Sequence, residues 1–495
     1  MWLRKWCLSL IFCTGAALAN GGDLPRVDEN IDPAKSFWAD HVHYAYPHQF
    51  ARVADSQGRM WEIAYLDVFR GTPEARAKAP VLVLLHGRAM NSGYWGELME
   101  KPLAAGWRVI SIDWSHGGKS LPKNLDLPVV RSFDDVRQIV FNLVVKHLGI
   151  AKASYLGHSM GGQLAAGYAL RYPTQVERLV LYAPGGLGTF PAIERNGFRY
   201  DDPELVKQPE KFMTAWQAGI LPSIGSTQEQ IERSFYVPAR PGSMPYLQRG
   251  SALSEFMVAS RAGVLRGNPR ERERFQQAYA WDTLAALSEC RLEDADSLPN
   301  RVVRLKVPTM LALGLKEPIV SLDSVQPVYL LARSNRSPIQ IKLYENAGHI
   351  IHTDLPGQFS ADVLAFLQSG KVAEPVYAGG PLYPERKPLA ALPAEVQRFK
   401  ERAEAAWSKR DLEQIRLAIY HPEFREDGQS LKERLDYFAS FVGMVSSWQL
   451  NVYDVQRQGE TMVMDIDVKN NFGVFPGKII LKQVAGEWLS YGNQK

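Results

Sequence analysis

The sequence has little cysteine and almost no excess charge, and beyond its first residues it has no long hydrophobic run. Of its three cysteines, Cys7 and Cys13 lie near the N-terminus, which leaves Cys290 alone in the rest of the chain. A single cysteine forms no internal disulfide, so the fold must rely on its hydrophobic core. The formal net charge of +4 over 495 residues gives no support for a nucleic-acid partner.

The N-terminus has the composition of a secretory signal. Arg4 and Lys5 precede the apolar run Cys7–Leu18, which is too short to cross a bilayer as a stable helix. Small residues around Ala19 then offer a cleavage site. We expect residues 1–19 to be removed, which predicts a periplasmic or secreted protein without a stable membrane anchor. An uncleaved anchor is the alternative.

Short apolar runs alternate with helical patterns through much of the chain. Continuous runs of β-branched residues and leucine are typical of strands buried on both faces of a parallel sheet. Strand–helix alternation favours an α/β fold with a doubly wound, mostly parallel sheet. The predicted strands are 61–68, 81–85, 109–112, 154–156, 176–182, 309–313 and 339–344, with helices over 136–148 and 359–367.

The length predicts more than one domain, because it exceeds what one hydrophobic core usually supports. Within a first domain at 20–370, residues 186–302 break the alternation and are helical in tendency, which predicts a cap over the strand ends. The alternative is a packing subdomain without a role in substrate choice. The large apolar residues of this stretch are Phe212, Met213, Trp216, Phe235, Tyr236, Phe256, Met257, Tyr279 and Trp281.

A second domain is predicted at the C-terminus. Prolines and glycines concentrate in residues 371–393, which indicates a linker. Residues 394–495 carry helical patterning as far as Tyr420 and then a run of predicted strands, which is typical of an α+β unit. The predicted strands of this unit are 448–455, 461–468, 478–484 and 488–491.

The pentapeptide Gly157–Gly161, with sequence GHSMG, is the strongest catalytic signal. It follows a predicted strand and precedes a helical segment, as a nucleophile elbow requires. Glycines on both sides permit the strained turn that lifts the hydroxyl of Ser159 out of the sheet. Ser159 is therefore the candidate nucleophile, and it needs a base to take its proton.

A base and an acid follow later in the chain, in the order serine, acid, histidine. His349 comes after the predicted strand at 339–344, and His352 is its competitor. Glu317 lies at the end of the strand at 309–313 and is the favoured acid to orient the imidazole. Asp323 is the alternative acid.

Acyl transfer also needs donors for the developing oxyanion. The backbone N–H of Met160, which follows the nucleophile, is one candidate. Arg88 follows His86-Gly87 at the end of a strand and is placed to give the second backbone N–H. The side chain of Arg88 is expected either to touch substrate or to be solvated, and residues 113–120 are expected to form a structural loop beside the site.

Residues 50 to 370 resemble the α/β-hydrolase superfamily. The motifs that carry the resemblance are HG at 86–87, GHSMGG at 157–162, GLKEPIV at 314–320 and NAGH at 346–349. Glu317 stands where the family usually has aspartate, and the usual DxxGxGxS is altered at His116-Gly117. A serine nucleophile argues against dehalogenase and epoxide-hydrolase chemistry.

The C-terminal segment resembles an NTF2-like (SnoaL-type) cone domain. The matching residues are Trp407, Arg410-Asp411-Leu412, Tyr420-His421-Pro422-Glu423-Phe424, Asp427-Gly428 and Trp488. The resemblance implies pairing with another domain or binding of a small apolar ligand, and some such domains are catalytic. Because the segment holds no convincing acid–base set, homo-oligomerisation or substrate docking is its expected role.

The leading hypothesis is an exported serine hydrolase that cleaves a carboxylic ester of a small-molecule acyl substrate. This cycle needs neither a metal nor an organic cofactor. His41, His43 and His48 invite a zinc site, but no cysteine or carboxylate cluster nearby completes one, so no metal is expected. The rivals are a cofactor-free perhydrolase or haloperoxidase, an amidase or peptidase, and a non-catalytic binding protein that kept the fold.

Overall fold

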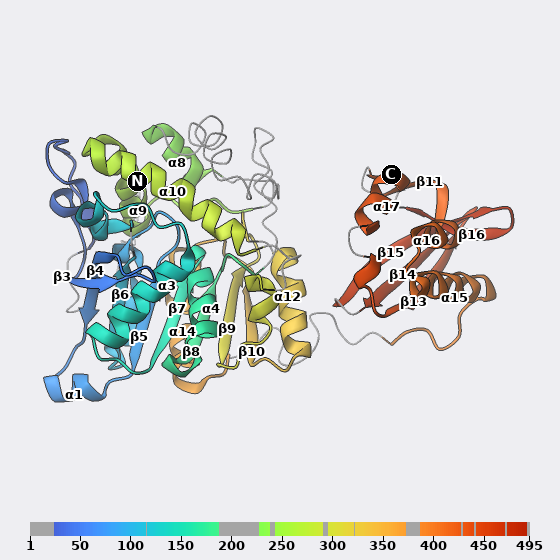
Figure 1. The fold of residues 1–495 in the computed structure, drawn as a ribbon, viewed down its shortest axis with the longest axis horizontal. Coiled ribbons are helices and arrows are strands. Elements are labelled where there is room, and N and C mark those ends of the chain that lie inside the picture. Colours follow the sequence, from blue (N-terminus) through green and yellow to red (C-terminus); the bar gives the residue numbers. More distant parts are fainter. Residues whose placement is uncertain are drawn as a thin grey trace, which may run out of the picture. The chain divides into compact units, whose positions relative to one another are not determined.

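The computed structural model describes residues 24–114, 116–187, 227–237, 243–290, 296–320, 322–372, 387–426, 429–439, 442–470 and 473–492. The chain divides into two compact units (Figure 1), Met1–Val328 with Asn335–Ala378, and Tyr329–Ser334 with Gly379–Lys495. Within the described ranges, no helix has both the length and the apolar character needed to span a membrane. Several predicted features lie outside these ranges, namely the signal at 1–19, the cap residues Phe212, Met213 and Trp216, linker residues 373–386, and Asp427-Gly428.

In the first unit, the described strands form an eight-stranded sheet of order β10-β9-β8-β7-β5-β6-β4-β3. Strands β5 to β10 run parallel, whereas β4 is antiparallel to both of its neighbours. The predicted α/β class with a mostly parallel sheet is therefore confirmed. The bounds are β3 His48–Ala54, β4 Met60–Val68, β5 Val81–Leu85, β6 Arg108–Asp113, β7 Ala153–His158, β8 Val176–Tyr182, β9 Thr309–Gly314 and β10 Ile339–Tyr344.

Every strand predicted in this unit is present, and β3 was missed. It is an edge strand with mainly exposed or half-exposed side chains, so it lacks the apolar run that marks the buried strands. A further two-stranded sheet pairs β1 (Arg26–Val27) with β2 (Val42–His43).

Helices pack against this sheet in pairs (Figure 1). Helix α2 (Glu97–Ala104) contacts α14 (Pro356–Ser369), while α3 (Phe133–Phe141) contacts α4 (Met160–Arg171). The helix predicted over 136–148 is α3 followed by a π-helical segment. The remaining described α-helices outside the cap segment are α1 Pro73–Lys78, α12 Leu322–Ser334 and α13 Ile351–Asp354.

The described part of the predicted cap segment is mainly helical. It contains α8 (Gln228–Tyr236), α9 (Ala252–Arg266), α10 (Pro269–Ser288) and α11 (Leu298–Val302). Phe256 and Met257 of α9 and Phe275 of α10 are buried with the apolar side chains of the sheet in one core. Helices α9 and α10 therefore contribute to the hydrophobic core of the first unit.

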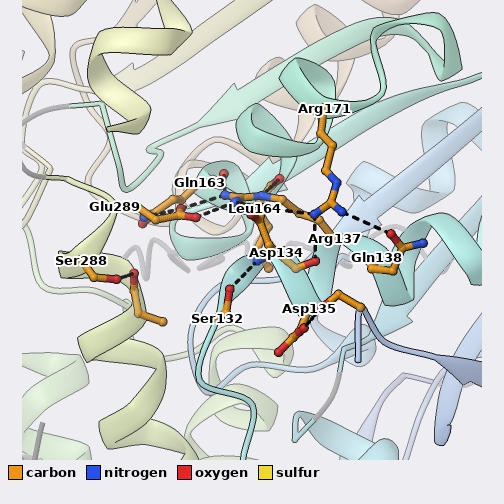
Figure 2. A network of polar contacts seen from close by, with 12 residues as sticks. Ser132, Asp134, Asp135, Arg137, Gln138, Gln163, Leu164, Arg171, Ser288 and Glu289 are labelled. Atoms are coloured by element: carbon orange, nitrogen blue, oxygen red, sulfur yellow. Dashed lines mark hydrogen bonds and ion pairs between the residues drawn. The ribbon is translucent and has the colours of Figure 1, made fainter. Parts of the chain in front are cut away.

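One buried arginine, Arg137 of α3, joins the end of α10 to α4 (Figure 2). The Arg137 side chain, 1% exposed, pairs with Glu289 at the end of α10 and with Asp134. It also donates to the carbonyl oxygens of Gln163 (3.1 Å) and Leu164 (3.3 Å) in α4. A Cβ at Gly167 would lie 2.2 Å from the guanidinium carbon, so only glycine leaves room for this side chain.

The second unit has an α+β arrangement. Its described strands form a six-stranded sheet of order β12-β11-β16-β15-β14-β13. Trp407 of α15 belongs to the core of this unit, and Trp448 packs against it with the two ring centroids 5.7 Å apart. The bounds are α15 Ala394–Lys409, α16 Leu412–Ile419, β11 Tyr420–Glu426, β12 Gln429–Ser430, α17 Leu431–Ala439, β13 Trp448–Gln458, β14 Thr461–Asn470, β15 Gly473–Val484 and β16 Glu487–Gly492.

The Arg137 network predicts unequal costs for two substitutions. Glu289→Ala leaves a buried guanidinium without its main carboxylate, so we expect a loss of about 3 kcal/mol in the free energy of unfolding. Arg171→Met removes an exposed partner of Asp134 and should cost about 0.5 kcal/mol. Urea unfolding followed by tryptophan fluorescence measures both variants. If Glu289→Ala lost no more stability than Arg171→Met, the buried Arg137–Glu289 pair would not stabilise the unit.

Candidate active site

The predicted nucleophile stands on a strained turn. Strand β7 ends at His158, α4 begins at Met160, and Ser159 between them has φ 54° and ψ −121°. A Cβ at Gly157 would lie 2.1 Å from the carbonyl oxygen of Gly161, and one at Gly161 would lie 2.1 Å from that of Leu85. Both glycines are therefore required, because any larger residue would force the strand and helix apart.

The structure brings the predicted base and acid together. The His349 Nδ1 donates to the Glu317 carboxylate, at 2.8 Å from Oε2 and 3.0 Å from Oε1. Glu317 Oε1 also accepts from the backbone N–H groups of Ile319 (2.7 Å) and Val320 (3.1 Å). Both side chains are buried. This pair fixes the tautomer of His349, because Nδ1 must carry the proton and Nε2 presents its lone pair.

Gly314 and Ala347 explain how two separate loops place this pair. Glu317 follows β9 and His349 follows β10, which are neighbouring parallel strands. The N–H of Lys316 donates to the carbonyl of Ala347 at 3.0 Å. A Cβ at Gly314 would lie 2.2 Å from that same carbonyl oxygen, so the glycine permits the close approach.

His158 connects the elbow to the other loops, a role that sequence reasoning missed. Its Nε2 donates to the carbonyl of His349 at 3.0 Å, so its Nδ1 accepts from the Tyr94 hydroxyl at 2.9 Å. The Tyr94 oxygen in turn accepts from the N–H of Gly87 at 3.1 Å. Burial, with the nearby His349 and His352, holds the pKa of His158 well below its usual value. The ring is therefore neutral, which this hydrogen-bond pattern requires.

Both ring nitrogens of His352, the competing base, are hydrogen-bonded to groups other than Ser159. Its Nε2 donates to the carbonyl of Tyr94 at 2.8 Å, and its Nδ1 accepts from the Tyr182 hydroxyl at 3.1 Å. Burial lowers its pKa to about 4. With both ring nitrogens occupied, His352 holds the loop after β10 in place. Asp323, the alternative acid, falls in α12, and its side chain lies outside the described part of the chain.

The two predicted oxyanion donors lie close to the elbow. Met160 is the first residue of α4, so its backbone N–H has no carbonyl partner within the helix. Arg88 follows Gly87, where an ideal Cβ would lie 3.3 Å from the Ser159 Cβ. The Arg88 side chain stacks over Tyr279 at 4.3 Å and donates to Thr283, both in α10, so it is not simply solvated.

Asp113, at the end of β6, anchors the loop that follows it. Asp113 accepts from the N–H groups of Ser92 (2.6 Å) and Lys119 (2.8 Å) and from the Tyr44 hydroxyl (2.7 Å). These bonds tie the end of β6 to Ser92, in the loop that follows β5, and to Lys119.

The cap segment also reaches the predicted base. The Tyr246 ring meets the His349 ring edge to face with centroids 5.3 Å apart. The N–H of Met244 donates to the carbonyl of Lys316 at 2.9 Å. Nothing in the local sequence around Tyr246 signals this contact, because it depends on how a distant segment folds over the sheet.

The N-terminal histidines contact one aspartate that sequence reasoning did not consider. Asp28 accepts from His41 Nδ1 at 3.2 Å and from His43 Nε2 at 3.0 Å, while His48 lies in β3. A search of the described residues finds no group of three or more side chains arranged to hold a metal ion. The His–Asp contacts join β1 to β2.

The comparisons with known proteins establish the family. A model of the alpha/beta hydrolase fold matches residues 80–355, more than half of the chain, so this chain belongs to the α/β-hydrolase family. It is 34% identical over 158 residues to a 2-hydroxy-6-oxononadienedioate/2-hydroxy-6-oxononatrienedioate hydrolase of Paraburkholderia phymatum, covering 28% of this chain and 54% of that protein. The match therefore spans about half of that relative's length.

Two further proteins are similar over a longer stretch. A monoacylglycerol lipase of Homo sapiens is 25% identical over 303 residues, 61% of this chain and 78% of the relative. A solved structure of a probable hydrolytic enzyme from Pseudomonas aeruginosa PAO1 has 26% identity and a TM-score of 0.49, covering 66% of this chain and 96% of the other. The family match and the two sequence relatives support a general hydrolase activity for this chain.

Proposed function

We propose that this hydrolase cleaves a carboxylic ester through a triad of Ser159, His349 and Glu317. The observation that carries the proposal is the buried His349–Glu317 pair, whose loop is hydrogen-bonded to the residue preceding Ser159. His349 Nε2 takes the proton of Ser159 as its hydroxyl attacks the acyl carbon. Glu317 stabilises the imidazolium that forms, and the backbone N–H groups of Met160 and Arg88 stabilise the oxyanion.

The second half of the cycle uses the same residues. His349 returns its proton to the leaving alkoxide, and an ester bond to Ser159 Oγ remains. His349 then activates a water molecule, which attacks this acyl-enzyme and releases the carboxylic acid. The monoacylglycerol lipase relative supports an ester over the amide and peracid alternatives.

The N- and C-terminal segments complete the proposal. The charged and apolar pattern of residues 1–19 supports export to the periplasm or beyond the cell. The C-terminal unit, with its α+β arrangement, is proposed to be NTF2-like and to serve in homo-oligomerisation or substrate docking.

The triad predicts a clear order among substitutions. Ser159→Ala should reduce ester turnover by roughly 10³-fold or more while the protein stays folded. Glu317→Gln should lower kcat far more than Asp323→Asn, a matched control, because the contact to His349 is made by Glu317. Steady-state hydrolysis of p-nitrophenyl esters of increasing acyl length, with circular dichroism of each variant, measures both. A folded Ser159→Ala variant with near-normal turnover would rule out the mechanism.

Export predicts the N-terminus of the mature protein. N-terminal sequencing of the protein purified from its native host should begin at or near Asn20. Recovery of the full-length chain from the cytosol would contradict the proposed localisation.

A further inference from the structure

A small cavity lies on the cap side of the loop that carries Arg88. One side of the cavity is lined by the segments that follow β5 and β6, including His86, Ala89 and His116. The other side, called its roof below, is lined by α10, including Tyr279 and Asp282. Within the loop at 86–89, Gly87 lies against Ser159, while His86 and Ala89 line this cavity.

His86 brings an unused hydrogen-bond acceptor to the cavity. Its Nδ1 donates to the carbonyl of Gly87 at 2.8 Å. Burial lowers the pKa of the ring, which stacks on Trp114, so a single proton sits on Nδ1. The Nε2 lone pair has no partner, in a side chain that lines the cavity. This nitrogen is buried and has no hydrogen-bond partner, and the side chain is 1% exposed.

His116 brings an unused donor. Its Nε2 accepts from the backbone N–H of Val130 at 3.1 Å, so this nitrogen carries no proton. Burial, with the charges of Arg274 and Arg59, lowers its pKa to about 3. The neutral ring therefore holds its proton on Nδ1, which is buried and has no hydrogen-bond partner. Leaving such polar atoms unpaired costs free energy, so each needs an explanation.

A hydroxyl has both the acceptor that His116 needs and the donor that His86 needs. A hydroxyl accepts from His116 Nδ1 through its oxygen and donates to His86 Nε2 through its hydrogen. A carboxylate or a ketone cannot do both, because neither donates. We propose that this cavity is a subsite for a hydroxyl group of the substrate, which makes the preferred substrate a hydroxylated ester. The inference rests on the proposed function and specifies its substrate class.

The roof of the cavity fits an uncharged polar group. Asp282 on α10 has its pKa raised to about 7 by burial, against the opposing charge of Arg88. Its carboxyl is therefore partly protonated near neutral pH and adds no full charge. Tyr279 is held in place because Arg88 and Arg261 each stack on its ring with their guanidinium carbons 4.3 Å from the centroid.

Binding and turnover are measured separately to test this subsite. Calorimetry on Ser159→Ala protein compares propyl butyrate with glycerol monobutyrate and with propyl 3-hydroxybutyrate, which carry the hydroxyl on the alcohol and the acyl side. We expect at least one hydroxylated ester to bind about tenfold more tightly than propyl butyrate, as one to two hydrogen bonds would give. Turnover of the same esters by unmodified protein tests the proposed function independently.

Two variants each remove one of the unpaired ring nitrogens and keep the hydrogen bond that the other ring nitrogen makes to the backbone. In a Ser159→Ala background, His116→Gln retains an acceptor for the Val130 N–H and lacks the Nδ1 donor. His86→Asn retains a donor for the Gly87 carbonyl and lacks the Nε2 acceptor, and it serves if the first variant fails to fold. Each should reduce the preference for the hydroxylated ester about tenfold, whereas His147→Gln, an exposed histidine outside the cavity, should not.

Each outcome decides one of the two proposals. A hydroxyl preference without turnover supports the subsite and overturns the ester-hydrolase function. Turnover without any hydroxyl preference, or a preference that both variants leave intact, overturns the subsite and assigns the two nitrogens to a bound water. Failure of all three esters to bind also overturns it.

Discussion

The close approach of strand and helix at the elbow is the constraint on which the site depends. Gly157 and Gly161 let the backbone turn so sharply that Ser159 adopts a positive φ. Such a conformation costs of order 1–3 kcal/mol and persists only when the surrounding structure holds it. Here the N–H of Ser159 donates to the carbonyl of Tyr182 at 2.9 Å, which pins the turn to strand β8.

Hydrogen bonds spread this constraint to the loops around the site. The chain of donors from Gly87 through Tyr94 to His158, and from His158 to the carbonyl of His349, links the candidate oxyanion loop to the base loop. It depends on a neutral His158, because a second proton on this ring would remove the acceptor for Tyr94. Burial lowers the pKa of His158 and so keeps the ring neutral. The histidines around Ser159 are thus divided between structure, in His158 and His352, and proposed chemistry, in His349.

Much of this arrangement could be predicted from the sequence because its signals are local. Strand β5 was predicted with its observed bounds, because Val81–Leu85 is a continuous apolar run of the kind typical of a buried parallel strand. The contact between Glu317 and His349 followed from the order of residues at the ends of successive strands. What was missed is non-local: Tyr246 reaches His349 from the cap, and Asp28 reaches His41 across a turn. Strand β11 was missed because it carries Pro422 and no apolar alternation.

Covalent labelling of the nucleophile tests the central claim most directly. The protein is treated with a fluorophosphonate, digested and analysed by mass spectrometry, with the Ser159→Ala variant treated in parallel. The account predicts one adduct, on the peptide that contains Ser159, and slower labelling of Glu317→Gln because its His349 is less able to hold the proton. Labelling of a different residue in an active protein, or active protein that resists labelling altogether, would contradict it.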